Sequence, residues 1–204
     1  MKTGIILLAA GSSSRLGRAK QLIEFQGETL ILKAIDEANK SRADCLVVVL
    51  GANAKLIQTG FDSSSTPFIL NPDWQHGMSS SMQAGLRFLM EKEAIDQVVL
   101  MLCDQPFVDA SLLDQLITAK ETSGKRIVAA AYSNTMGVPA LFDKCYFEEL
   151  LQLTGSEGAK KVIFNHLPEV HALDFPLGAV DLDTEEDVNQ FLSLYPQKNL
   201  PNPS

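Results

Sequence analysis

Residues 4–21 read Gly-Ile-Ile-Leu-Leu-Ala-Ala-Gly-Ser-Ser-Ser-Arg-Leu-Gly-Arg-Ala-Lys-Gln, an apolar run that leads into a loop of glycines, serines and cations. A short apolar run without alternation is typical of a strand that is covered on both faces, as in a parallel sheet. We therefore predict a strand over residues 4–10. Because ligands bind at the carboxyl ends of strands in open α/β sheets, we expect the following loop to border a binding site.

The rest of the chain alternates between similar apolar runs and amphipathic segments. We predict further strands over residues 45–50, 67–71, 97–103 and 126–132, and helices over residues 29–40, 78–90 and 111–120. Thr29 is a candidate N-cap, and Met78, Met82, Leu86 and Leu89 share one helical face that we assign to the core. The pattern predicts a single-domain, Rossmann-like α/β sandwich of three layers with a mostly parallel central sheet. This domain is expected to span residues 1–195, followed by a Pro/Asn-rich tail over residues 196–204.

Composition excludes several classes of protein. The chain has 204 residues, 46% of them hydrophobic, and a net charge of -8, which suits one core and argues against a nucleic-acid binder. No apolar stretch reaches membrane-spanning length, and the first apolar run is too short for a signal peptide, so we predict a cytoplasmic protein with no membrane partner. Cys45 and Cys103 lie in or beside apolar runs and are expected to be buried free thiols. The cysteines and histidines lack zinc-site spacing.

The loop after the first strand has the chemistry of a triphosphate site. Gly11 and Gly17 allow the backbone to approach a ligand closely, and successive N–H groups with serine hydroxyls can hold phosphate oxygens. Arg15 and Lys20 supply positive charge. Neither the P-loop pattern nor the dinucleotide fingerprint Gly-x-Gly-x-x-Gly is present. The ordered set Gly-x3-Arg-x-Gly-x2-Lys favours a phosphate loop over an ordinary glycine-serine turn.

Residues 8–20 resemble the pattern Leu-Ala-(Ala/Gly)-Gly-x-Ser-x-Arg-x-Gly-x-x-Lys of the MobA-like nucleotidyltransferase superfamily. Four later segments resemble, in the same order, motifs of its molybdenum cofactor cytidylyltransferases: GMSSSMQAGL at 77–86, LCDQP at 102–106, GVPALF at 137–142 and DLDTEED at 181–187. The resemblance implies transfer of a nucleotidyl group with release of pyrophosphate. Ala10 replaces the glycine of guanylyl-transferring relatives, which implies CTP. The implied acceptor is molybdopterin, and contacts with a molybdoenzyme are suggested.

The resemblance also implies a role for each matching residue. The catalytic residues would be Arg15, Lys20 and Asp104, and Mg²⁺ would be bound by Asp104 and Asp181. The nucleotide-binding residues would be Leu8, Ala9, Ala10, Gly11, Ser12, Ser13, Arg15, Lys20, Asn71, Gly77, Ser79 and Ser81. The acceptor-binding residues would be Gln105, Pro106, Gly137, Val138 and Pro139.

Some of these residues can be judged from the sequence itself. Asp104 directly follows an apolar run, so its carboxylate belongs at a strand end, where it suits magnesium; a plain turn before Pro106 is the alternative. Thr184 and Asp187 have the spacing of a capping box for a helix over residues 188–194. We therefore assign Asp183 to the flank of that cap and prefer Asp181 as the metal ligand. The serines at 79–81 are equally suited to starting a helix.

Three functions stay open at this stage. Residues 155–160, GSEGAK, depart from the family's Gly-Asp-x-Gly-x-Arg, which leaves the acceptor open. Lys160 and Lys161 could bind an anionic acceptor, although solvated helix charges are commoner. Besides cytidylyl transfer to molybdopterin, the alternatives are cytidylyl or guanylyl transfer to another small phosphorylated acceptor, such as a sugar or polyol phosphate, and non-catalytic delivery of a cofactor.

Overall fold

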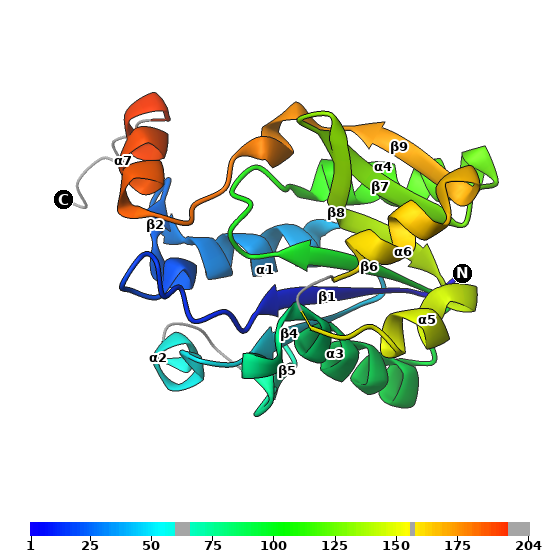
Figure 1. The fold of residues 1–204 in the computed structure, drawn as a ribbon, viewed down its shortest axis with the longest axis horizontal. Helices are drawn as coiled ribbons and strands as arrows, with labels where there is room; N and C mark the ends of the chain where they lie inside the picture. The colour runs from blue at the N-terminus through cyan, green and yellow to red at the C-terminus, as the bar shows by residue number, and fades with distance from the viewer. Residues whose placement is uncertain (60–65, 156–157, 196–204) are drawn as a thin grey trace.

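A computed structural model describes residues 1–59, 66–155 and 158–195; the expected tail and part of the 155–160 segment lie outside these residues. Its centre is a seven-stranded sheet of order β5-β4-β1-β6-β8-β7-β9 (Figure 1). Only β8 runs antiparallel to its neighbours in this sheet. The expected mostly parallel α/β sheet is therefore confirmed. The strands are β1 (Thr3–Ala9), β4 (Cys45–Leu50), β5 (Phe68–Leu70), β6 (Gln97–Leu102), β7 (Ile127–Tyr132), β8 (Thr135–Asp143) and β9 (Val170–Asp174), with a separate hairpin of β2 (Glu24–Phe25) and β3 (Glu28–Thr29).

Helices cover both faces of the sheet and give three layers (Figure 1). Side chains of β1 alternate between two hydrophobic clusters, because successive strand residues point to opposite faces: Ile5 and Leu7 pack with α1 and α4, whereas Ile6 and Leu8 pack with α3, α5 and α6. The helices are α1 (Leu30–Lys40), α2 (Ala54–Gln58), α3 (Met78–Glu93), α4 (Ala110–Ser123), α5 (Phe147–Leu151), α6 (Lys160–Asn165) and α7 (Glu185–Leu194).

The predicted strands and helices are all present, with two corrections in detail. Thr29 lies at the N-cap position of α1, but its hydroxyl makes no capping hydrogen bond and is buried. Met78 is 44% exposed, because it begins α3 before the buried face of that helix starts, whereas Met82, Leu86 and Leu89 are fully buried. Among the cysteines, Cys103 is buried as expected and Cys45 is only half-buried.

The C-terminal helix α7 stands over the loop that follows β1 (Figure 1). Its predicted capping box is confirmed: the Asp187 N–H donates to Thr184 Oγ1 at 3.1 Å, and the Thr184 N–H donates to Asp187 Oδ2 at 2.8 Å. Leu16 of the loop packs with Leu182 and Val188 in a third hydrophobic cluster. The last segment of the fold thus closes one side of the edge where β1, β6 and β7 end. No helix in the described part of the chain has the length and hydropathy to cross a membrane.

Candidate active site

The loop after β1 is held in place by two side chains. The Gln21 amide Nε2 donates to the carbonyl oxygens of Ala9 and Gly11 at 2.9 and 3.0 Å, and the Ser13 hydroxyl accepts from the Lys20 N–H at 3.1 Å. Gln21 is 1% exposed, so these bonds are shielded from water. A β-carbon on Gly11 would meet no atom within 4 Å, which leaves open space beside this backbone. The loop is therefore fixed with its glycine facing free volume.

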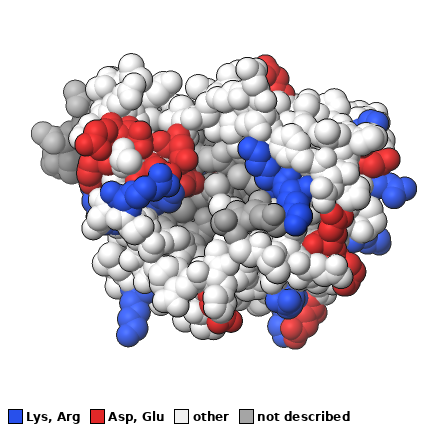
Figure 2. Space-filling model, in the orientation of Figure 1, with Lys and Arg blue, Asp and Glu red and all other residues white. Residues whose placement is uncertain are grey.

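The cations of this loop meet carboxylates from the segment that leads into α7. Arg15 pairs with Asp183, and Lys20 bridges Asp183 at 3.1 Å and Asp104 at the end of β6. Arg18 makes a separate bidentate pair with Glu185, at 2.7 and 3.1 Å. Figure 2 shows acidic side chains around basic ones at this end of the molecule. Three cations and several carboxylates thus share one end of the sheet.

Three carboxylates form a compact group suited to a cation. Oxygen atoms of Asp104, Asp181 and Asp183 all lie within 4.8 Å of one another. Asp104 is 7% exposed, and its Oδ1 atom is buried without a hydrogen-bond partner among the described residues. An ionised oxygen that is buried and unpaired is costly unless a cation or donor meets it. The group therefore fits a divalent cation with oxygen ligands.

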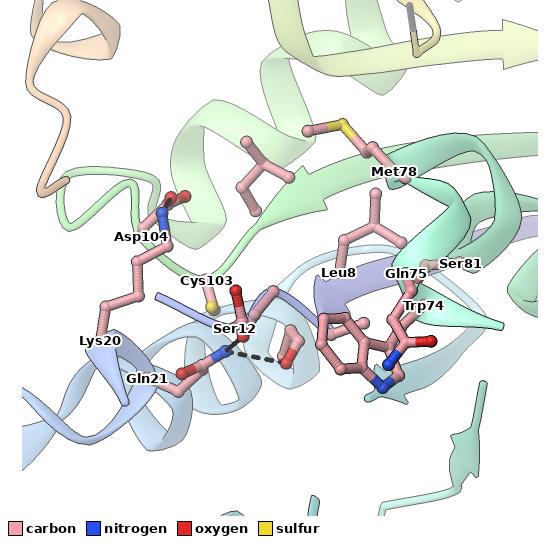
Figure 3. A pocket seen from close by; sticks show the side chains of 15 residues that line it. Leu8, Ser12, Lys20, Gln21, Trp74, Gln75, Met78, Ser81, Cys103 and Asp104 are labelled. Atoms are coloured by element: carbon pink, nitrogen blue, oxygen red, sulfur yellow. Dashed lines mark hydrogen bonds and ion pairs between the residues drawn. The ribbon is translucent and has the colours of Figure 1, made fainter. Parts of the chain in front are cut away.

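A pocket lies between the end of β1 and the start of α3, and we call it the β1–α3 pocket. Figure 3 shows Lys20 and Asp104 pointing toward one another on one side of it, with Trp74, Gln75 and Ser81 on the other. Its lining combines small residues of the loop after β1 with one large aromatic ring, that of Trp74. The lining residues are Leu8, Ala9, Ala10, Gly11, Ser12, Lys20, Gln21, Trp74, Gln75, Gly77, Met78, Ser81, Leu102, Cys103 and Asp104.

A second pocket contains the carboxylate group, and we call it the carboxylate pocket. Its lining residues are Arg15, Lys20, Met78, Leu102, Asp104, Gln105, Tyr132, Ser133, Thr135, Gly178, Ala179, Val180, Asp181 and Asp183. Lys20, Met78, Leu102 and Asp104 line both pockets. Molecules bound in the two pockets would therefore meet at Lys20 and Asp104.

Most, but not all, of the predicted nucleotide-binding residues line the β1–α3 pocket. Arg15 lies instead in the carboxylate pocket. Asn71 braces the start of α3, since its Nδ2 donates to the hydroxyls of Ser80 and Ser81, both at 2.9 Å. Ser79 lines a neighbouring pocket between Asn71 and Arg87, and its hydroxyl is buried without a hydrogen-bond partner among the described residues. The Ser13 hydroxyl accepts from the Lys20 N–H and so holds the loop backbone in place. Lining a pocket does not establish ligand binding, so the ligand roles of all the predicted nucleotide-binding residues remain predictions.

Of the predicted acceptor-binding residues, only Gln105 lines the carboxylate pocket. Its Nε2 donates to the Val138 carbonyl at 3.0 Å, so residues 137–139 lie behind the pocket wall. Four residues that line these pockets were not predicted as site residues: Gln21, Trp74, Tyr132 and Asp183. Gln21 ends the phosphate-loop stretch, and Asp183 precedes the capping box, so both lay within segments already singled out; nothing comparable marked Trp74 or Tyr132.

The charges of the site shift several pKa values. Burial lowers the pKa of Lys20, but the neighbouring Asp104 and Asp183 outweigh this and raise it above its usual range. Burial, and then the charges of Asp104 and Asp183, raise the pKa of Asp181. Burial also raises the pKa of Cys103, which keeps this pocket thiol protonated. Lys20 is therefore a cation at neutral pH, and the folded state disfavours ionisation of Asp181.

Replacing Asp181 should stabilise the protein in the absence of metal. The raised pKa means that the folded state disfavours the ionised form, so this carboxyl destabilises the fold as the pH rises through its folded-state pKa. Asp181→Asn should therefore raise the Tm at neutral pH in EDTA, and the gap to wild type should shrink as the pH falls and the wild-type carboxyl is protonated. Thermal unfolding at a series of pH values measures this. A lower Tm for the variant at neutral pH would contradict it.

Comparisons with known proteins place the chain among nucleotidyltransferases. A model of the MobA-like NTP transferase domain matches residues 5–170. Nicotine blue oxidoreductase of Paenarthrobacter nicotinovorans is 28% identical over 198 residues, 93% of each chain. Molybdenum cofactor guanylyltransferase of Shewanella putrefaciens is 22% identical over 191 residues, 91% of this chain and 94% of that protein.

A solved structure gives the same fold. Rv0371c of Mycobacterium tuberculosis H37Rv aligns with a TM-score of 0.82 and 28% identity, covering 94% of this chain and 97% of that one. The same mycobacterial protein has also been solved in complex with manganese, with a TM-score of 0.79 at 25% identity over 95% of this chain and 99% of that one.

Proposed function

The chain belongs to the MobA-like NTP transferase family and is a nucleotidyltransferase, and from this premise we propose that it transfers CMP from CTP to the phosphate of molybdopterin, with Mg²⁺. The observation that carries the proposal is the meeting of the β1–α3 pocket and the carboxylate pocket at Lys20 and Asp104. A donor in the first pocket and an acceptor in the second would have their reacting groups at this junction.

The β1–α3 pocket holds the nucleotide. The fixed loop from Gly11 to Lys20 receives the triphosphate, and Trp74 offers a flat apolar surface near the base. Ala10 is 6% exposed, and a β-carbon on Gly51 would approach its β-carbon to 2.8 Å and its carbonyl oxygen to 2.6 Å. Because Gly51, the residue after β4, packs this closely against Ala10, the Ala10 methyl group cannot withdraw from the pocket. This supports the smaller pyrimidine base over guanine.

The reaction needs no covalent intermediate on the protein. An oxygen of the acceptor phosphate attacks the α-phosphorus of CTP, the bond from that phosphorus to the bridging oxygen breaks, and pyrophosphate leaves with the electron pair. A phosphate monoester has a second pKa of about 6, so the attacking oxygen is already ionised at neutral pH and needs no general base. Lys20 stabilises charge on the α-phosphate, and Arg15 stabilises the leaving pyrophosphate. The protonated Cys103 takes no part.

Asp104, Asp181 and Asp183 would hold the divalent ion. The unpartnered Oδ1 of Asp104 and the short separation of the three carboxylates fit such an ion, and Mg²⁺ combines carboxylates with substrate phosphates as ligands. When bound, the ion neutralises phosphate oxygens. The manganese complex of the similar mycobacterial protein agrees with a divalent metal at this fold. Asp183 would then be a ligand of the ion, and Arg15 and Lys20, which pair with Asp183 in this structure, would be available to the triphosphate.

The choice of molybdopterin is supported by the motif at 137–142 and by the relative named molybdenum cofactor guanylyltransferase. The relative named nicotine blue oxidoreductase raises a different class of reaction. Against an oxidoreductase, the loop after β1 lacks the Gly-x-Gly-x-x-Gly fingerprint for dinucleotides.

Pyrophosphate release tests the proposal. Purified protein with Mg²⁺ is given CTP, GTP, ATP or UTP, each with and without molybdenum-loaded molybdopterin. We expect release with CTP plus the cofactor and much less with GTP. The variant Ala10→Gly should use GTP better than wild type, because it removes the methyl group that narrows the base end of the pocket.

Other outcomes would change the proposal in defined ways. Release with CTP and only a sugar or polyol phosphate would keep the chemistry and discard the pterin. A preference for GTP that Ala10→Gly leaves unchanged would discard the assignment of the base. Nucleotide binding without release for any pair would favour cofactor delivery, and oxidation of NADH or NADPH without pyrophosphate release would favour an oxidoreductase.

A further inference from the structure

Tyr132 occupies a closely fitted place at the end of β7, in the wall of the carboxylate pocket. A β-carbon on Gly137 would come within 2.6 Å of its hydroxyl oxygen, and one on Gly178 within 2.6 Å of its ring carbon Cδ1. Both approaches are closer than side-chain contacts allow, so the ring fits only because glycine occupies both positions. The ring therefore cannot shift without moving the segments that carry these glycines.

The hydroxyl end of Tyr132 is tied to the Asp104 side of the carboxylate group. It donates a hydrogen bond to the Val138 carbonyl at 3.1 Å. The same carbonyl accepts from Gln105 Nε2 at 3.0 Å, and Gln105 directly follows Asp104. One oxygen atom of β8 thus connects Tyr132 to the end of β6.

The ring of Tyr132 packs against the turn that precedes Asp181, the second member of the carboxylate group. Gly178, which it contacts, lies in a 3₁₀ turn over Pro176–Ala179, three residues before Asp181. This turn is anchored to β7 by the Phe175 N–H, which donates to the Ala131 carbonyl at 2.9 Å. Burial, followed by the charge of Asp181, raises the pKa of Tyr132, so the phenol stays a neutral donor beside the carboxylates.

We propose that Tyr132 is a positioning residue that sets the distance between Asp104 and Asp181 and thereby the metal affinity of the carboxylate group. The role rests on the metal site of the proposed function. Asp104 and Asp181 lie on segments that are distant in sequence, and Tyr132 contacts the neighbours of both. Residues behind the metal ligands determine how well the ligands are placed, and changing them weakens metal binding.

Direct binding of Mn²⁺, followed by its electron paramagnetic resonance signal, tests the role without any turnover. Tyr132→Phe keeps the ring and loses the hydrogen bond to Val138, whereas Tyr132→Leu loses both contacts. The Mn²⁺ dissociation constant should rise in that order, reaching about 10-fold for the leucine variant. Gly178→Ala should weaken Mn²⁺ binding as well, because the new β-carbon would displace the ring.

The control is Tyr146→Phe, at a buried tyrosine that packs against His166 in the cluster on the opposite face of the sheet. It should bind Mn²⁺ as wild type does. CTP binding in EDTA serves as a second control, because a general loss of structure would weaken it. We expect CTP binding in EDTA to be the same in every variant. If Tyr132→Leu does not fold, Tyr132→Phe and Gly178→Ala decide.

The outcomes separate this inference from the proposed function. Wild-type affinity for Mn²⁺ in folded Tyr132→Phe and Gly178→Ala would overturn the role of Tyr132 and leave the metal site standing. Absence of Mn²⁺ binding by the wild-type protein would overturn the metal site and this role together. Weakened Mn²⁺ binding that is matched by equally weakened CTP binding in EDTA would reduce Tyr132 to a structural residue.

Discussion

Replacing Lys20 by alanine should lower kcat/KM for CTP and the acceptor by about 10²- to 10³-fold, because it removes a fixed cation from the point where charge develops. Lys20 lines both pockets and touches Asp104 and Asp183. Steady-state pyrophosphate release with saturating Mg²⁺ measures the loss. The control is Arg18→Ala, which removes a cation two residues away that pairs with Glu185 and lines neither pocket; it should keep wild-type activity.

Lys20→Ala should also change how strongly Mn²⁺ stabilises the protein against thermal unfolding. The pKa of Lys20 is raised in the folded state, so its pairing stabilises the protein throughout the range below its unfolded pKa, which includes neutral pH. Lys20→Ala should therefore have a lower Tm in EDTA, and Mn²⁺ should recover more of the Tm than in wild type, because an ion can replace the lost charge beside Asp104. Unchanged kcat/KM in the folded variant would remove Lys20 from the mechanism.

The parts of the fold that sequence could predict are those buried on both sides. Strands β1, β4 and β6 are continuous apolar runs because helices cover both faces of the sheet, and that environment leaves an unambiguous pattern. Strand β8 escaped prediction because Gly137 and Pro139 interrupt it. Its hairpin with β7 also turns at Ser133 and Asn134, with φ of 47° and 58°, without the Asn-Gly pair that usually marks such a turn.

The site shows the same division between local and long-range information. Lys20 was selected because it ends the ordered set of glycines and cations in the loop after the first strand, and Asp104 because it directly follows an apolar run. Asp183 was assigned to the flank of the capping box, which does exist one residue later, yet its carboxylate also reaches Arg15 and Lys20. A cap is a local signal, whereas this pairing spans more than 160 residues. The place of the Tyr132 ring is set by Gly137 and Gly178, which lie on two other segments, so no short stretch of sequence could predict its role.

Replacing Asp104 by asparagine should weaken Mn²⁺ binding at least about 100-fold, which is beyond the effect expected of residues behind the ligands. Asp104 is the most buried of the three carboxylates, and its Oδ1 has no partner within the described part of the chain. Asparagine keeps the size of the side chain and removes the charge that a divalent cation requires. Electron paramagnetic resonance of Mn²⁺ measures the affinity, and pyrophosphate release should fall by about 10³-fold in parallel.

The comparison of Asp104→Asn with Lys20→Ala then assigns the two partners of one ion pair to different tasks. Both variants remove the same ion pair, so a pair with a purely structural role would give the same result in each. We expect instead that Asp104→Asn loses metal binding, whereas Lys20→Ala keeps it and loses turnover. The matched control is Asp109→Asn, at an aspartate that caps α4 and lies outside both pockets; it should bind Mn²⁺ normally. Wild-type Mn²⁺ affinity in Asp104→Asn would place the ion elsewhere and leave Asp104 only as the counterion of Lys20.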